Sequence, residues 1–441
     1  MSKEKSLKAS FQDGIFASIA LGVTANYITP FMLFIGANNF QIGLLASIPQ
    51  LFTSIIQLTT TEIAKIIKSR LKTIYIFVFL QALTFFLISL VFFIPINLQI
   101  AMGIFLITLN SIFGSMTQPV WMSLMSDTVD SDKYGKYFAW RGKILGFIVF
   151  ISGLIAGSYL FIVHNKIVGF ISLFLLAGIC RIISGIYVSK MDDLPVRNID
   201  NTNNNFGEKF SYIQFIRRFK ESNFVKFVLF ISLFNFATFL AAPFFAVYML
   251  DELKFKYSTY TIIVSSGCLG GLLFLPLWGN FTDKYGNVKI IKTSAIFIVI
   301  MPLLWLFSKN PVYLTIVNFF GGYIWSGYNL ATVNFIFDAV SSEKRTRCVS
   351  YFNFTNGFFI FLGSFIGGWL AKNLPGLILN SSLLTLVFIS AVMRFFVNIF
   401  MLKSFNEVKK VEKIEDRELL YAIFGLKPML NIVESVYRYK T

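Results

Sequence analysis

Long apolar segments alternate with short polar ones along almost the whole chain. Twelve of them are long enough to cross a hydrocarbon core of about 30 Å as helices, and none alternates as a half-buried strand does. Because only helices and closed barrels satisfy their backbone hydrogen bonds in lipid, the pattern predicts an all-α polytopic membrane protein with twelve transmembrane helices. The predicted spans are 13–36, 43–66, 73–94, 99–126, 142–163, 167–190, 224–250, 257–281, 290–308, 311–338, 350–373 and 377–403.

One long polar segment divides this pattern in two. It contains the low-complexity run NIDNTNNN and then the basic amphipathic piece FIRRFKESNFVKF, which is typical of a linker that lies against a membrane surface. We therefore expect two pseudo-symmetric six-helix bundles. The expected divisions are an N-terminal bundle over 1–190, a cytoplasmic linker over 191–223, a C-terminal bundle over 224–404 and a cytoplasmic tail over 405–441.

Composition excludes a soluble protein. Only 14% of the residues are charged and 56% are hydrophobic, whereas a soluble domain carries roughly 25% charged residues. The net charge of +17 does not indicate a nucleic-acid partner, because the basic residues gather in alternate loops, as the positive-inside rule requires. The chain is thus expected to lie in the cell membrane with both termini cytoplasmic. The loops concerned carry Lys65, Lys68, Arg70 and Lys72; Lys133, Lys136, Arg141 and Lys143; Lys284 and Lys289; and Lys344, Arg345 and Arg347.

Several classes of chemistry have no support in the sequence. Cys180, Cys268 and Cys348 are scattered and have no metal-ligand spacing, so we expect no metal and no cofactor. No cluster of His, Asp, Glu or Cys at one depth suggests a membrane enzyme. A nucleotide-driven pump is disfavoured because no G-x-x-x-x-G-K-[ST] loop is present.

A charged interruption between two apolar segments carries the most specific motif. Trp278–Lys292 reads WGNFTDKYGNVKIIK, with Gly279, Asp283, Gly286 and Lys289 in the spacing G-x-x-x-D-x-x-G-x-x-K. The glycines permit a tight turn and close helix approach, and the carboxylate lies at a helix end. This pattern resembles the loop signature of the major facilitator superfamily of secondary transporters.

The two halves of the chain also resemble each other. Asp127 and Asp338 each end a segment and precede a basic loop, and Lys72 matches Lys289. Arg181 and Arg394 each precede a lysine by the same interval; we expect both arginines to pair structurally. These correspondences recur about 210 to 217 residues apart, as duplicated bundles would. The first-half loop EIAKIIKSRLK departs from the signature because it lacks the acidic position and the second glycine.

The resemblance implies a central cavity that opens alternately to each side, with charged residues as gates. Asp283 would latch the cytoplasmic helix ends in one state, or else would only cap a helix. Asp127 and Arg141 flank one loop and are expected to form an ion pair, with topology charges as the alternative. Asp338 with Arg345 or Arg347 would be the second-half counterpart.

Polar and aromatic residues near mid-helix are the candidate substrate contacts. Hydrogen bonding between helices is the alternative for each of them. As a set they favour a polar but uncharged cavity, and no deep proton-relay pair is visible, although Asp13 or Glu62 leaves proton coupling open. The candidates are Asn26, Tyr27, Asn110, Gln118, Asn235, Thr238, Trp325, Tyr328 and Asn329.

These features favour a secondary active transporter over an enzyme. We expect a monomer in the lipid bilayer that moves a small organic solute by alternating access. The alternatives are a flippase or exporter of lipids or amphipaths on the same fold, and a channel. The sequence does not assign the substrate, the direction of transport or the coupling ion.

Overall fold

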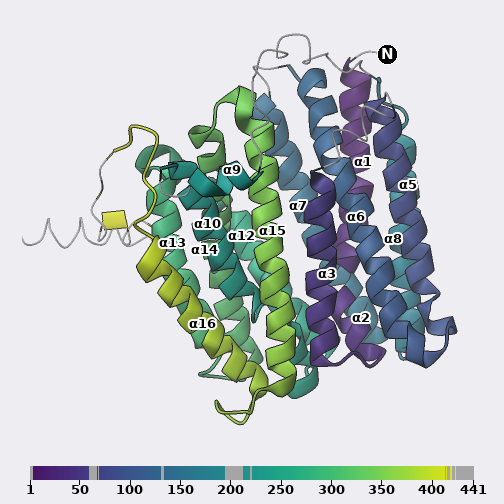
Figure 1. Ribbon diagram of the computed structural model, residues 1–441. Coiled ribbons are helices and arrows are strands. Elements are labelled where there is room, and N and C mark those ends of the chain that lie inside the picture. The colour runs from purple at the N-terminus through teal and green to yellow at the C-terminus, as the bar shows by residue number, and fades with distance from the viewer. Residues whose placement is uncertain are drawn as a thin grey trace, which may run out of the picture.

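The computed structural model describes residues 3–58, 67, 69–130, 134–193, 212–218, 221–412, 414, 418–419 and 423. Long helices packed side by side make up almost all of these residues, and none of them lies in a named strand (Figure 1). We call the described residues up to 193 the first half and those from 212 the second half. Most of the predicted linker and much of the predicted tail lie outside the described residues, so the domain boundaries stay a prediction.

The first half contains six membrane-spanning elements. Two helices, separated by a turn at residues 25–27, form the first of them. The helices are α1 (Lys3–Thr24), α2 (Ile28–Phe34), α3 (Asn39–Gln57), α5 (Arg70–Ser89) with the short η1 (Val91–Phe93), α6 (Ile96–Thr128), α7 (Tyr134–Ile162) and α8 (Lys166–Val188).

The second half repeats this arrangement after a short helix that precedes it. Its first span is again broken, at residues 240–243, where Pro243 lacks a backbone donor. The helices are α9 (Tyr212–Arg217), α10 (Asn223–Phe239), α11 (Phe244–Val247) with η4 (Tyr248–Glu252), α12 (Tyr257–Tyr285), α13 (Asn287–Leu304), α14 (Pro311–Ala339), α15 (Ser342–Asn373) and α16 (Ser382–Met401).

Eleven of the described helical segments are long and apolar enough to cross a membrane. The remaining long helix, α14, has 29 residues, and its asparagines at 318, 329 and 334 lower its hydropathy. The predicted all-helical membrane fold is therefore confirmed. The largest shift of a predicted boundary is at 13–36, where the helix already begins at Lys3.

The two halves meet along two helix pairs, α3 with α15 and α7 with α12. Figure 1 shows α3 and α15 side by side at the centre, with the first half on one side of them and the second half on the other. We call the end of the bundle at which α1 and α5 begin and α6 and α12 end the basic face, since the lysine-rich loops lie there. The other end is the opposite face.

Candidate functional site

Hydroxyl groups join the two halves toward the opposite face. The Tyr27 hydroxyl donates to the Gly153 carbonyl over 2.5 Å and lies 2.9 Å from the Thr261 hydroxyl of α12. The Tyr260 hydroxyl donates to the Asn26 carbonyl over 2.8 Å. The Tyr27–Thr261 and Tyr260–Asn26 bonds connect the break in the first span to the start of α12, whereas the Tyr27–Gly153 bond lies within the first half.

Pro30 explains why the Asn26 carbonyl is free to accept. In a continuous helix this carbonyl would receive the N–H of residue 30, but proline has none. The helix therefore breaks at residues 25–27, and the unpaired carbonyl accepts from Tyr260 of the other half. A local property of the sequence thus creates a contact between the halves.

A second seam joins α3 to α15. A Cβ atom on Gly43 would lie 2.5 Å from the Gly368 Cα, so only glycine allows the two backbones to come this close. Beside it, the Asn39 amide donates to the Ala371 carbonyl over 3.1 Å. Among described residues, this bond and the two at Tyr27–Thr261 and Tyr260–Asn26 are the hydrogen bonds between the halves, and all three lie toward the opposite face.

Toward the basic face, α6 and α14 each expose a row of side chains. The row on α6 holds Gln118 and Met122, and the equivalent residues of α14, 211 positions later, are Asn329 and Val333. Neither Gln118 nor Asn329 forms a hydrogen bond with a residue that the structure describes. Both amides lie nine residues, or about 13 Å, from the aspartates that end these helices.

The other substrate candidates have different surroundings. Trp325 is half-buried one turn from Asn329 and packs edge-on against Tyr328, whose side chain is buried. Asn110 donates to Thr84 over 2.8 Å, and Asn235 donates to Asn356 over 2.7 Å. Thr238 donates to its own helix, and Asn26 and Tyr27 belong to the seam described above. Gln118, Asn329 and Trp325 are thus the candidates best placed to meet a solute.

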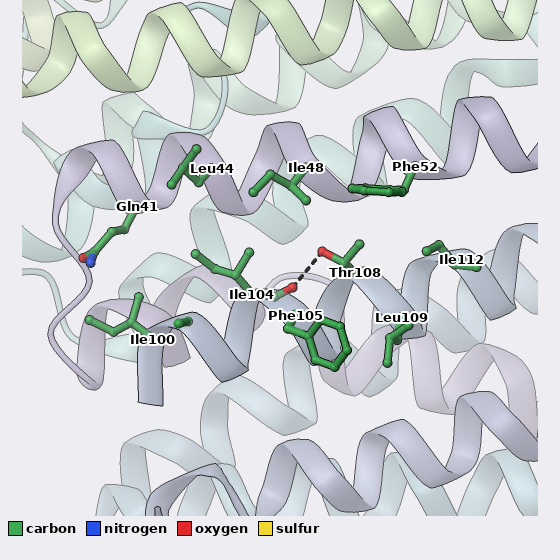
Figure 2. A pocket seen from close by; sticks show the side chains of 11 residues that line it. Gln41, Leu44, Ile48, Phe52, Ile100, Ile104, Phe105, Thr108, Leu109 and Ile112 are labelled. Atoms are coloured by element: carbon green, nitrogen blue, oxygen red, sulfur yellow. Dashed lines mark hydrogen bonds between the residues drawn. The ribbon is translucent and has the colours of Figure 1, made fainter. Parts of the chain in front are cut away.

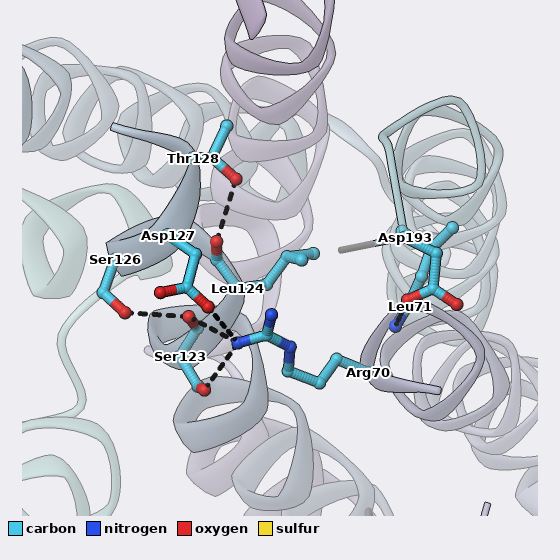
Figure 3. Close-up of polar contacts among 8 residues, drawn as sticks. All are labelled: Arg70, Leu71, Ser123, Leu124, Ser126, Asp127, Thr128 and Asp193. Atoms are coloured by element: carbon cyan, nitrogen blue, oxygen red, sulfur yellow. Dashed lines mark hydrogen bonds and ion pairs between the residues drawn. The ribbon is translucent and has the colours of Figure 1, made fainter. Parts of the chain in front are cut away.

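The expected ion pair between Asp127 and Arg141 is wrong. Asp127 instead pairs with Arg70 over 2.8 Å, and the same Arg70 nitrogen donates to the Ser123 carbonyl and hydroxyl (Figure 3). Arg141 points to α1, where it donates to the Ser10 carbonyl over 3.1 Å, and it stacks over the Trp121 ring. Arg70 rather than Arg141 pairs with Asp127 because Arg70 is the first residue of α5, which packs against α6.

The expected pair of Asp338 with Arg345 or Arg347 stays a prediction. Asp338 accepts from the Asn287 amide over 2.7 Å and pairs with Lys409 over 2.8 Å. The side chains of Arg345 and Arg347 lie outside the described residues. Asn287 begins α13 as Arg70 begins α5, so both halves hold the aspartate from equivalent positions, 217 residues apart.

The segment after the last helix of each half returns to cap a helix start. Asp193 accepts from the Leu71 backbone over 3.3 Å (Figure 3). It also accepts from the Ser69 hydroxyl over 2.6 Å. In the second half, Glu407 accepts from the Val288 backbone over 2.8 Å. A carboxylate is favourable at both places because a helix N-terminus carries partial positive charge.

The signature loop adopts the turn that its second glycine permits. Gly286 has φ +87°, a conformation that favours glycine, and a Cβ atom there would meet Glu407. Gly279 has open space around it, so the expected close helix approach is not found at that position. Asp283 is exposed and makes no hydrogen bond or ion pair with the described part of the chain, and Lys289 is half-buried.

Asp13, Arg181 and Ser184 form a buried polar cluster in the first half. Arg181 donates to the Ser184 hydroxyl over 3.1 Å, and Ser184 donates to Asp13 over 2.5 Å. Arg394 likewise donates to Ser390 and to the Ile298 carbonyl. The arginines therefore have the structural partners that we expected, whereas the burial of Asp13 was not foreseen.

Two hollows accompany these seams. One, of about 650 Å³, lies between the halves at the opposite face and includes Lys166, Asp251 and Lys256. The other, of about 480 Å³, lies between α3 and α6 and is lined almost entirely by apolar side chains (Figure 2). Of its two polar residues, Thr108 donates to the Ile104 carbonyl of its own helix and the Gln41 side chain accepts from the Asn38 backbone, so both already have hydrogen-bond partners.

Known structures share this architecture. A variant of the nucleoside transporter NupG superposes with a TM-score of 0.72 at 14% identity, covering 90% of this chain and 100% of that chain. A bacterial homologue of the iron transporter ferroportin in an inward-facing state gives 0.67 at 13% identity, covering 92% and 99%. The inward-open xylose transporter XylE from E. coli gives 0.66 at 12% identity, covering 95% and 98%.

Identities this low show the fold alone. A search of curated proteins finds no significant match. The family profile described as Major Facilitator Superfamily, however, matches residues 14–246 and 227–435, which is most of the sequence. Together with the helical architecture, this match shows that the chain belongs to the major facilitator superfamily.

Proposed function

We propose that this protein is a secondary active transporter that moves a small organic solute by alternating access, and that the structure is its state open at the basic face. The observation that carries the proposal is the asymmetry between the two faces. Hydrogen bonds and a glycine contact join the halves toward the opposite face. Toward the basic face, α6 and α14 expose Gln118 and Asn329, and Asp283 has no hydrogen bond or ion pair with the residues that the structure describes.

The basic face is assigned to the cytoplasm of the cell membrane. Lysine and arginine concentrate in the loops of this face, and the positive-inside rule favours that orientation. Both termini are then cytoplasmic, and the state is inward-open. Because the pathway lies within one chain, a monomer suffices for transport.

The proposed substrate is polar and uncharged. Gln118 and Asn329 offer amide donors and acceptors from equivalent places in the two halves, and Trp325 offers an indole face beside them. Nucleosides and xylose, named for the structural neighbours, are solutes of this kind. Iron, named for another, is less suited, because no group of three His, Cys, Asp or Glu residues in the described part of the chain could hold a metal ion.

A lipid or amphipath flippase is the alternative, and one observation favours it. The hollow between α3 and α6 has the apolar lining that an alkyl chain needs. Replacing Thr108 by Trp would narrow it. Lipid handling predicts that this variant loses activity, whereas transport of a polar solute through the central pathway predicts that it does not.

A ligand-stabilisation screen tests the main proposal, since a bound solute raises the apparent melting temperature by mass action. The purified full chain is screened against nucleosides, sugars and other neutral polar solutes. A hit should lose its stabilising effect in Gln118→Ala and in Asn329→Ala and keep it in Gly321→Ala, a site with open space around it. A hit that stabilises all three variants equally would contradict this location for the site.

A further inference from the structure

The two halves differ in how they neutralise the aspartate that ends the fourth helix of each. In the first half the cation is internal, because Arg70 of α5 pairs with Asp127 and its side chain is only 5% exposed. In the second half the position of Arg70 is taken by Asn287, which donates a hydrogen bond but carries no charge. Asp338 is only 11% exposed, and among the side chains that the structure describes it has no cation from the helices that surround it.

The missing charge comes from the segment after α16. Lys409 lies 2.8 Å from Asp338, on the carboxylate oxygen that Asn287 does not occupy. A carboxylate this buried is costly without a cation nearby. We propose that Lys409 is a positioning residue of the second-half gate and replaces the arginine that the first half uses.

The chain around Lys409 is built to hold it there. Phe405 is fully buried among the second-half aromatic side chains. Asn406 and Asn223 exchange two hydrogen bonds of 2.8 Å, and Glu407 caps α13 at Val288. We call residues 405–409 the clasp, because they fasten the basic-face ends of α10, α13 and α14 to one another.

The Lys409–Asp338 pair is more exposed to solvent than the Arg70–Asp127 pair of the first half. Lys409 is 58% exposed, so water and salt reach its ammonium group, whereas Arg70 is shielded. The Lys409–Asp338 pair is therefore weak and can open, and it lies beside the loop that carries Asp283 and Gly286. If the pair breaks when the basic face closes, its formation biases the protein toward the state open at that face; this step rests on the proposed alternating access.

Thiol labelling tests the clasp without knowledge of the substrate. Met122→Cys reports access from the basic face, in a full-length background that carries Cys268→Ser and Cys348→Ser. At low salt, Lys409→Ala should slow labelling by about two- to fivefold, as expected for a partly exposed pair. Lys409→Arg should label like the parent. One molar salt, with a screening length of about 3 Å, should slow the parent to the rate of Lys409→Ala.

Asp338→Asn and Tyr260→Phe complete the design. In an Asp338→Asn background, both the salt effect and the effect of Lys409→Ala should vanish; the salt titration alone is decisive if Lys409→Ala does not fold.

Tyr260→Phe removes a bond of the opposite face and should also slow labelling. If Tyr260→Phe slows labelling and Lys409→Ala does not, the clasp is refuted and alternating access stands. If neither slows it, both are refuted. An effect of Lys409→Ala that persists in Asp338→Asn also overturns the clasp.

Discussion

Tyr27 of α1–α2 and Thr261 of α12 place their hydroxyl oxygens 2.9 Å apart across the boundary between the halves. The Tyr27 hydrogen is directed to the Gly153 carbonyl, so Thr261 is the donor in this pair. Every group in this chain of hydrogen bonds is buried, which makes an unpaired member costly. The contact therefore belongs to a closed state of the opposite face and must break if that face opens.

Replacing Tyr27 by Phe should shift the conformational equilibrium away from the state described here. The variant removes one hydrogen bond between the halves, at a cost of about 1 kcal/mol or roughly a fivefold change in population, and one bond within the first half. Labelling of Met122→Cys should slow accordingly. The matched control is Tyr159→Phe, which loses a 2.8 Å bond to Ser172 within the first half and should leave labelling unchanged.

Replacing Gly43 by Leu should prevent the opposite face from closing. A side chain at this position would collide with the Gly368 backbone, which cannot yield as a flexible side chain can. We expect thiols placed on the opposite face to become accessible and transport to stop. A Cβ atom at Gly321 would have no neighbour within 4 Å, so Gly321→Ala should leave both thiol accessibility and transport unchanged. Normal transport by Gly43→Leu would contradict the assigned role of this contact.

Asn110 and Gln118 lie on the same helix and should respond to mutation in different ways. Asn110→Ala removes hydrogen bonds to α5 and should destabilise the protein by about 0.6 to 1.7 kcal/mol, with solute affinity unchanged. Gln118→Ala removes an exposed amide that has no hydrogen-bond partner in the described part of the chain, and it should weaken solute binding with no loss of melting temperature. Melting curves with and without solute separate the two effects. If Gln118→Ala instead lowers the melting temperature and leaves solute affinity unchanged, Gln118 does not lie on the pathway.

Arg70→Met should be among the more destabilising substitutions at the basic face. It leaves Asp127 without its cation, and a charge-assisted hydrogen bond contributes about 1.5–3 kcal/mol, to be discounted here because Asp127 is 23% exposed. Lys3→Met breaks a pair with Asp130, which also lies near the end of α6, but both side chains there are exposed. The melting temperature should fall clearly in the first variant and stay within error in the second.

Asp283→Asn should alter the cycle without altering this state. The carboxylate makes no hydrogen bond or ion pair with any described residue, so the melting temperature and the labelling of Met122→Cys in the absence of solute should match the parent. If Asp283 latches the basic face when that face closes, transport should slow severalfold. Normal flux in this variant would show that Asp283 does not latch the basic face.

The helices could be predicted because hydropathy is a property of the local sequence. Partner choice could not, since Arg70 and Arg141 are both basic residues near Asp127 and only packing decides between them. A usable signal for Arg70 was nevertheless present, because the 217-residue interval that relates Lys72 to Lys289 also relates Arg70 to Asn287. The interval between Gln118 and Asn329 likewise equals that between the two helix-ending aspartates. The burial of Asp13 had no such signal, because nothing local determines which face of α1 packs on α8.

Two distances measured in the same preparation test alternating access most directly. Spin labels at Ser126 and Phe337 report the basic-face ends of α6 and α14, and labels at Ile96 and Val312 report their opposite-face ends, where both residues are exposed. The account predicts two populations for each pair, with solute shortening one distance as it lengthens the other. A single population at both ends, or distances that change in the same direction, would contradict it.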